Sequence, residues 1–201
     1  MVFFGFDDKI EAVIAVSDQV KPSSIAAIQE IQKRNITIYM LTGDNEHTAQ
    51  AIANKVGITH FKASMMPADK GLFIEQLQQQ GKTVAMVGDG INDAHALAQA
   101  DVGIAMGSGA DIAMESAGIT LIHSDLMQIS KAISLSRATM KTIRQNLFWA
   151  FIYNIIAIPI AAGALYPISG FLLNPMIAGA AMSMSSLSVL TNSLRLKRQK
   201  L

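Results

Sequence analysis

The sequence lacks cysteine altogether, and it lacks an excess of charge of either sign. The absence of cysteine excludes disulfides, thiolate metal ligands and a cysteine nucleophile. Sixteen basic and fifteen acidic side chains nearly cancel over the 201 residues. Nucleic-acid binding usually depends on a basic excess that neutralises phosphates, so we expect no nucleic acid among the partners.

Charge is also missing from one long part of the chain, because no charged residue lies between Arg144 and Arg195. Segments 147–166 and 175–194 within this part are apolar, and each is about 20 residues long, enough for a helix to cross roughly 30 Å of hydrocarbon. We therefore expect two transmembrane helices. Basic residues precede the first and follow the second, which places the soluble half and both termini in the cytoplasm of an integral plasma-membrane protein.

A buried helical hairpin in a soluble protein is the alternative interpretation of these segments. Soluble helices of this length usually carry a charged face, and these two carry none, so the membrane interpretation is favoured. The lipid bilayer is then the first expected partner.

Short apolar runs alternate with helical patterns from residue 11 to residue 122. This alternation predicts an α/β fold with a Rossmann-like parallel sheet covered by helices on both faces. Functional residues gather at the carboxyl ends of the strands in such sheets. The expected strands are 11–17, 36–41, 83–87, 102–106 and 119–122, and the expected helices are 22–34, 45–56, 67–80, a short one from residue 92, and a turn near 110–117.

One predicted strand stops on Gly88-Asp89-Gly90, and Asn92 and Asp93 follow. Glycines let the backbone turn sharply and approach a ligand. Asp89 and Asp93 can converge on one hard cation, most naturally Mg²⁺. Asn92 is expected to open the next helix, whose free N–H groups favour a nearby phosphate. Taken alone, the motif is a weak signal, and a calcium loop or a plain turn competes with the magnesium site as its explanation.

Two further polar groups stand at corresponding places in the alternation. Thr42, Gly43 and Asp44 follow a predicted strand, so the Thr42 hydroxyl and the Gly43 N–H can donate to a phosphoryl oxygen; a turn that caps the next helix explains them equally well. Lys70 lies in the first turn of a predicted helix, where the helix dipole disfavours a cation. Together with the aspartate pair, these residues favour phosphoryl-transfer chemistry over coincidence.

A resemblance to the phosphorylation domain of P-type ATPases, which has the haloacid dehalogenase-like fold, is carried by MLTGDNEHTAQAIANKVGI, MPADK and MVGDGINDAHALAQADVGIAMGSGADIAMESAGITLI. The C-terminal part resembles the last two membrane helices of the copper-exporting, heavy-metal class. The resemblance implies a partial phosphorylation domain over 1–140, followed over 141–201 by two membrane helices and a basic cytoplasmic tail. It also implies ATP as the substrate of the whole pump and Cu(I) as its transported ion, while Ag(I) prefers the same soft ligands.

The family resemblance also implies roles for individual residues. It assigns Mg²⁺ to Asp89, with Asp93 close by. It assigns the phosphoryl group and its surroundings to Thr42, Gly43, Asp44, Lys70 and Asn92, and the shape of the neighbouring backbone to Gly103, Gly107, Ser108 and Gly109.

In the membrane part, Tyr153 and Asn154 of the first helix and Met182 and Ser186 of the second resemble the copper ligands of the family. A thioether suits Cu(I), and a polar group at membrane depth usually needs a partner or a function. Met182 and Ser186 are four residues apart and so share one helix face. Helix packing through small and hydroxyl residues is the competing explanation. A copper chaperone is a further partner that the resemblance implies.

The sequence departs from the family pattern in what it lacks. It contains no Asp-Lys-Thr-Gly motif, whose aspartate accepts the γ-phosphate, and no Cys-Pro-Cys of the ion-entry helix. The predicted sheet thus lacks its nucleophile-bearing strand, and we expect the chain to be inactive without the remainder of the pump. A smaller departure is His95, which stands where the family pattern usually has proline.

Two functions are compatible with these features. The first is the C-terminal part of an ATP-driven Cu(I) or Ag(I) exporter, acting with a remainder in the same or a separate chain. The second is non-catalytic: a truncated membrane protein, or a regulatory or split partner of an intact pump. Phosphoenzyme formation in a reconstituted complex, with and without the Asp89 carboxylate, separates them. A soluble phosphatase of the same fold is disfavoured by the missing nucleophile and by the predicted hairpin.

Overall fold

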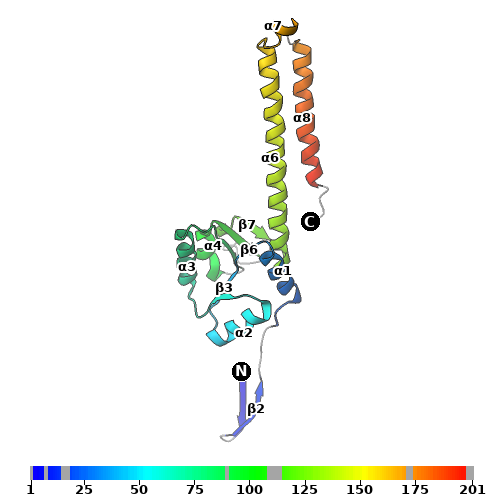
Figure 1. Ribbon diagram of the computed structural model, residues 1–201. Helices are drawn as coiled ribbons and strands as arrows, with labels where there is room; N and C mark the ends of the chain where they lie inside the picture. The colour runs from blue at the N-terminus through cyan, green and yellow to red at the C-terminus, as the bar shows by residue number, and fades with distance from the viewer. Residues whose placement is uncertain are drawn as a thin grey trace. The chain divides into compact units, whose positions relative to one another are not determined.

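The computed structural model describes residues 2–6, 9–14, 19–88, 91–107, 115–170 and 174–197. The chain divides into two compact units, Met1–Ser130 and Lys131–Leu201. All the strands that the structure describes belong to the first unit, and the second unit is a helical hairpin (Figure 1).

Two parallel sheets form the centre of the first unit. Strand β3 (Tyr39–Leu41) pairs in parallel with β4 (His60–Lys62), and β5 (Ala85–Gly88) pairs in parallel with β6 (Val102–Met106), which in turn pairs with β7 (Ile119–Leu121). The predicted parallel α/β architecture is therefore confirmed. No ladder joins β3 to β5 within the described part of the chain, so the parallel strands are divided between two sheets.

The N-terminal strand prediction was wrong in its pairing. Strand β2 (Lys9–Ile14) covers part of the predicted 11–17 strand, but it pairs antiparallel with β1 (Val2–Phe6). The alternation rule treated every strand as parallel, whereas two strands joined by a short connection can pair as a hairpin. The sequence analysis did not predict β4, because Phe61 stands between the polar residues His60 and Lys62 and no apolar run marks this strand.

Helices α1 (Pro22–Gln32) and α2 (Glu46–Val56) supply the core beside β3 and β4, where Ile28, Ala53, Val56 and Ile58 form a buried cluster. The bounds of α2 follow from its caps. The Asn45 side chain accepts a hydrogen bond from the Thr48 N–H, and Gly57 ends the helix with φ of 78°. This confirms the predicted helix over 45–56.

A second cluster joins α3 (Pro67–Gln79) and α4 (Ala94–Gln99) to β5 through Ile74, Met86, Ala96 and Leu97. Leu41 of β3 packs against this cluster, so the two sheets share apolar contacts although they share no ladder. The helix after β5 does not begin at Asn92 as predicted. Residues Ile91–Asp93 form a 3₁₀ turn, η1, and α4 begins at Ala94.

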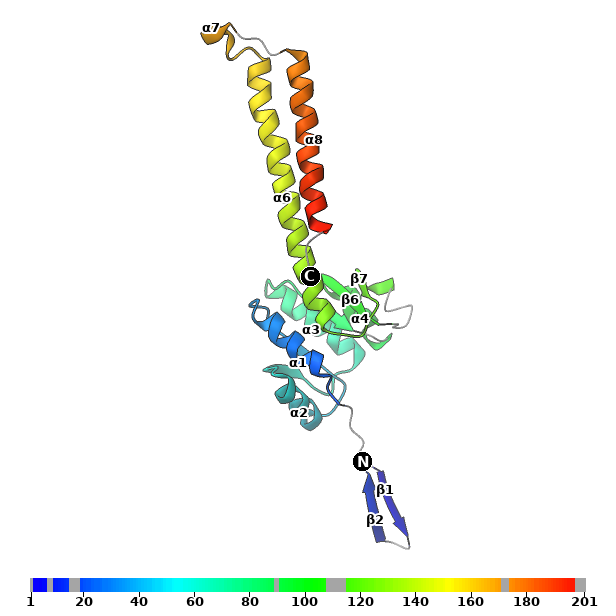
Figure 2. The same ribbon diagram turned by 90° about the vertical axis from the view of Figure 1, so that its right-hand side faces the viewer.

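The second unit contains most of α6 (Met127–Ala161), whose first turn belongs to the first unit, together with the short α7 (Tyr166–Ser169) and α8 (Pro175–Lys197). Helices α6 and α8 run side by side in both views (Figure 2). The expected segment 147–166 is not a separate helix, because α6 runs through its start without a break and ends at Ala161. In the described part of the chain, no helix combines the length and the mean hydropathy needed to cross a membrane.

Candidate functional site

The best-defined contact between predicted site residues joins Lys70 to Asp93. The Lys70 Nζ lies 2.7 Å from the Asp93 Oδ1, and both side chains are only 14% exposed. The pair links the first turn of α3 to the end of η1, beside the carboxyl end of β5. Charged hydrogen bonds of this kind contribute about 2 kcal/mol, and removing one partner leaves the other charge poorly solvated.

Local structure explains how a lysine is held in the first turn of α3. Pro67 begins the helix, and the Met66 N–H donates to the Asp69 carboxylate at 2.9 Å, which caps the helix start. The unfavourable interaction between Lys70 and the helix dipole is offset by Asp93 opposite. The Asp93 carboxylate is therefore engaged with Lys70, and although Asp93 precedes α4 it makes no side-chain cap to that helix.

Gly88, the last residue of β5, allows Asp93 to approach the strand. A Cβ at residue 88 would lie 2.7 Å from the Asp93 Cβ and 2.8 Å from its Oδ2, closer than real atoms come. The first glycine of the Gly-Asp-Gly motif is therefore required by the close approach of the Asp93 side chain, whereas the sequence predicted that it makes room for a ligand. Asp89 and Gly90 lie outside the described residues.

At the end of β3, Thr42 and Asp44 form a local ring. The Thr42 hydroxyl donates to the Asp44 Oδ2 at 3.1 Å, and the Asp44 N–H donates to the Thr42 Oγ1 at 3.1 Å. The loop is anchored to the segment after β4, because the Ser64 N–H donates to the Asp44 carbonyl at 2.7 Å. Among the described residues, no hydrogen bond connects this ring to the Lys70–Asp93 pair, so the structure gives two separate polar groups, one at the end of β3 and one beside the end of β5.

His95 lies against the backbone of α3. A Cβ at Gly71 would come within 2.6 Å of the His95 Cδ2 and 2.8 Å of its Nε2, so the imidazole occupies the space that a side chain at residue 71 would need. Sequence reasoning noticed His95 only as a departure from a usual proline, and it missed the link to Gly71.

Asp101 also escaped the sequence analysis. Its Oδ2 accepts a hydrogen bond from the Val84 N–H at 2.7 Å, which ties the segments leading into β5 and β6 together. This bond, with a smaller contribution from Gln78, holds the pKa of the Asp101 carboxyl below its usual value.

The described residues contain no group of three or more histidine, aspartate or glutamate side chains arranged to hold a metal ion. At the end of β5 the described residues supply one carboxylate, that of Asp93, and its Oδ1 is engaged by the Lys70 ammonium.

In the hairpin, the predicted copper residues bond within their own helices. The Asn154 Nδ2 donates to the Ala150 carbonyl at 2.9 Å, and the Ser186 hydroxyl donates to the Met182 carbonyl at 3.2 Å. The Tyr153 ring lies 6.4 Å from that of Trp149, and Met182 is 70% exposed. Among the described residues, no hydrogen bond brings the pair on α6 to the pair on α8.

The polar contacts between α6 and α8 lie farther from the turn of the hairpin than the predicted copper residues do, because they join residues 145–146 to residues 192–193. The Asn192 Nδ2 donates to the Asn146 Oδ1 at 2.8 Å and to the Gln145 Oε1 at 3.3 Å, and the Asn146 Nδ2 donates to the Ser193 hydroxyl at 2.9 Å. We refer to these four residues as the polar clamp. Sequence reasoning missed it, although amides at both ends of a charge-free region were a usable signal.

Residues 2–101 match the family described as haloacid dehalogenase-like hydrolase. The first unit thus contains a haloacid dehalogenase-like hydrolase domain, and the chain as a whole is homologous to copper-transporting P-type ATPases. It is 59% identical over 198 residues to the probable copper-transporting ATPase PacS of Synechocystis, covering 98% of this chain and 27% of that protein. It is 52% identical to the silver exporting P-type ATPase of Salmonella typhimurium over 100% of this chain and 24% of that protein.

The chain is also similar in fold to a solved P-type ATPase structure. A zinc-transporting PIB-type ATPase in its E2.Pi state superimposes with a TM-score of 0.83 at 37% identity, covering 94% of this chain and 30% of that one. The chain therefore spans about a quarter of the length of the curated relatives it matches.

Proposed function

We propose that this chain is the C-terminal part of an ATP-driven P-type pump that exports Cu(I) or Ag(I). The observation that carries the proposal is the Lys70–Asp93 contact beside the end of β5, in a chain homologous along its length to copper and silver ATPases. The activity belongs to the assembled pump.

In the proposed mechanism, Asp93 positions the Lys70 ammonium in the absence of substrate. When the phosphoryl group arrives, the ammonium turns toward it and stabilises the negative charge on the phosphoryl oxygens. The Thr42 hydroxyl and the Gly43 N–H donate to phosphoryl oxygens, which requires the Thr42 hydroxyl to leave its bond to Asp44. Asn92 orients the group from η1. Asp89 and Asp93 would hold Mg²⁺, which neutralises phosphoryl charge when bound.

The phosphate acceptor is proposed to lie outside these 201 residues, since the sequence has no Asp-Lys-Thr-Gly motif. No ladder joins β3 to β5 among the described strands, which supports this part of the proposal, because a parallel strand placed between them would bring an acceptor aspartate next to Thr42 and Lys70.

The hairpin is proposed to lie in the membrane with both its ends in the cytoplasm. Support comes from the lack of charge between Arg144 and Arg195 and from the exposed apolar side chains of α6 and α8, including Phe151, Ile155 and Leu187. Tyr153, Asn154, Met182 and Ser186 would then contribute to the path of the soft cation.

The test is complementation. The chain and the remainder of the pump, produced as separate polypeptides, are reconstituted together and incubated with radiolabelled ATP. We expect an acid-stable phosphoenzyme on the remainder only when both are present. Labelling of the remainder that is unaffected by this chain would refute the proposal and favour a non-catalytic role.

A further inference from the structure

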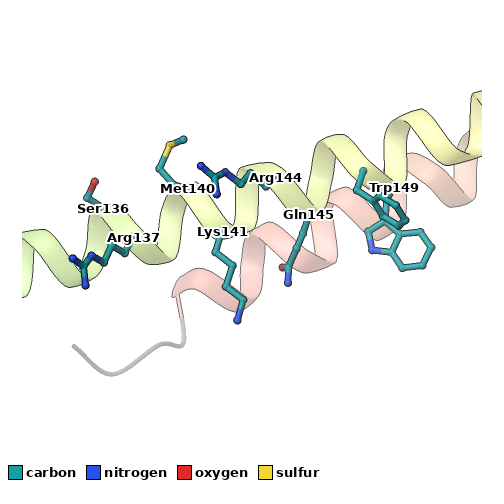
Figure 3. Close-up of a pocket in the computed structure, with 8 residues that line it drawn as sticks. Ser136, Arg137, Met140, Lys141, Arg144, Gln145 and Trp149 are labelled. Carbon is teal, nitrogen blue, oxygen red and sulfur yellow. The ribbon is translucent and has the colours of Figure 1, made fainter. Parts of the chain in front are cut away.

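A shallow hollow of about 580 Å³ lies on the surface of α6 (Figure 3). Its lining includes three cations, Arg137, Lys141 and Arg144, and ends at the aromatic residues Phe148 and Trp149. The spacing of the cations, four and then three residues, places them on one helix face. All three are exposed. We refer to Arg137, Lys141 and Arg144 as the basic collar.

The charge of the collar is not compensated within its own unit. The sequence contains no aspartate or glutamate after Asp125, while eight basic residues follow it. The ion pairs in the described part of the chain all belong to the first unit. A cluster of this kind therefore favours an anion from outside the hairpin.

The residues beyond the collar change character in a fixed order along α6. The polar clamp comes next, and then Phe148 and Trp149, whose rings pack edge to face at 5.6 Å. Phe148 and Trp149 are 60% and 47% exposed, so apolar surface directly adjoins the cations. Charge, aromatic rings and then uncharged residues is the order in which a helix meets headgroups, interface and hydrocarbon.

We propose that the basic collar binds the phosphate of an anionic phospholipid in the cytoplasmic leaflet, with its acyl chains lying along Phe148 and Trp149. The inference rests on the proposed membrane position of the hairpin. Two guanidinium groups can each contact phosphate oxygens through a planar fork, and Lys141 between them adds a third charge. The exposed rings of Phe148 and Trp149 beside the cations favour a lipid over a free phosphate ion, because only a lipid has acyl chains that can cover these rings.

Trp149 is the only tryptophan of the chain, so its fluorescence reports on this hollow alone. The full chain is reconstituted in phosphatidylcholine vesicles, and the phosphatidylglycerol content is raised in steps. We expect a saturable change in Trp149 emission with phosphatidylglycerol, and none with added inorganic phosphate. Each charge near an anionic bilayer contributes about fivefold in affinity, so the triple variant Arg137→Gln, Lys141→Gln, Arg144→Gln should lose roughly 100-fold.

A matched control removes three exposed charges from the first unit, Lys9→Gln, Lys33→Gln and Lys55→Gln, and should respond as the wild type does. Carbonate-resistant insertion into phosphatidylcholine vesicles is measured in parallel. Failure to insert would refute the membrane part of the proposed function. Normal insertion with no preference for phosphatidylglycerol, an equal response to free phosphate, or an unaltered triple variant would each overturn the lipid site alone.

Discussion

The two parts of the molecule differ most in charge. All fifteen acidic residues lie at or before Asp125, together with eight of the sixteen basic residues, whereas the other eight basic residues follow with no acidic residue among them. In the acid-rich part a cation finds a specific carboxylate, as Lys70 finds Asp93. In the hairpin the cations have no such partner within their own unit. The near-zero net charge of the whole chain thus conceals one part in which acidic residues predominate and another in which every charged side chain is basic.

Removing the paired cation of the acid-rich part should have the largest effect. In the assembled pump, Lys70→Ala should lower the rate of phosphoenzyme formation by about 100-fold or more, because one preorganised charge on the phosphoryl group is lost. Labelling by radiolabelled ATP measures it. Lys55→Ala, an exposed lysine at the end of α2, is the control and should be neutral. A variant at residue 70 with normal labelling would remove Lys70 from the mechanism.

Met182→Ala tests the proposed role of the hairpin in binding the transported soft cation. The loss of the thioether should reduce Cu(I) transport into vesicles by about tenfold or more, while phosphoenzyme formation from ATP stays measurable. Met176→Ala is the matched control, since Met176 lies on the same helix and is 80% exposed. Equal losses at both positions would mean that methionine at these sites serves packing.

Gly88→Ala tests the close approach between the Gly88 backbone and the Asp93 side chain in the first unit. The new Cβ would collide with Asp93, and we expect a loss of about 2 kcal/mol in the free energy of unfolding of the first unit. Denaturant unfolding followed by circular dichroism measures it. Gly118→Ala, whose nearest neighbour would be 3.9 Å away, should cost far less.

The effect of Gly71→Ala on the stability of the first unit should depend on residue 95, which lies opposite: destabilising with His95 present and stabilising once His95 is replaced by alanine. With His95 present the new methyl group meets the imidazole and destabilises the first unit by about 1 kcal/mol. In a His95→Ala background the same change should stabilise α3 by roughly 1 kcal/mol, because alanine is the better helix former. The four proteins form a double-mutant cycle, and additive effects would show that the contact is not made.

The smallest effect concerns pH and Asp101. Its folded-state pKa lies below the unfolded value, so its contribution to stability is present above the unfolded pKa and disappears as pH falls through the folded pKa. Asp101→Asn should therefore lower the unfolding midpoint slightly at pH 6 and not at all in strong acid. Equal differences from the wild type at both pH values would contradict this account.

Regular patterns in the sequence predicted the parallel strands, the capped helix α2 and the polar groups at strand ends. Strand β4 and the pairing of β2 were not predicted, because β4 has only one apolar residue and the pairing of β2 depends on a neighbour that no local pattern identifies. The Lys70–Asp93 contact joins residues 23 apart, so the sequence could suggest both as site residues without showing that they meet. The collision of His95 with any side chain at residue 71 is likewise a matter of packing.

The polar clamp fixes how far the two helices of the hairpin can slide along each other. Apolar faces pack almost equally well at several offsets, but a shift by one turn would separate the Asn192 amide from Asn146 and Gln145 and break both hydrogen bonds. In antiparallel helices each step toward the start of α8 is matched by a step toward the end of α6. Counting from the clamp, Asn154 is therefore level with Met184 and Ser185, within one turn of both Met182 and Ser186. The hydrogen bonds of the polar clamp, near one end of the hairpin, thus also set the alignment at its middle. If the helices were shifted, Asn154 of α6 would no longer lie within one turn of both Met182 and Ser186 of α8.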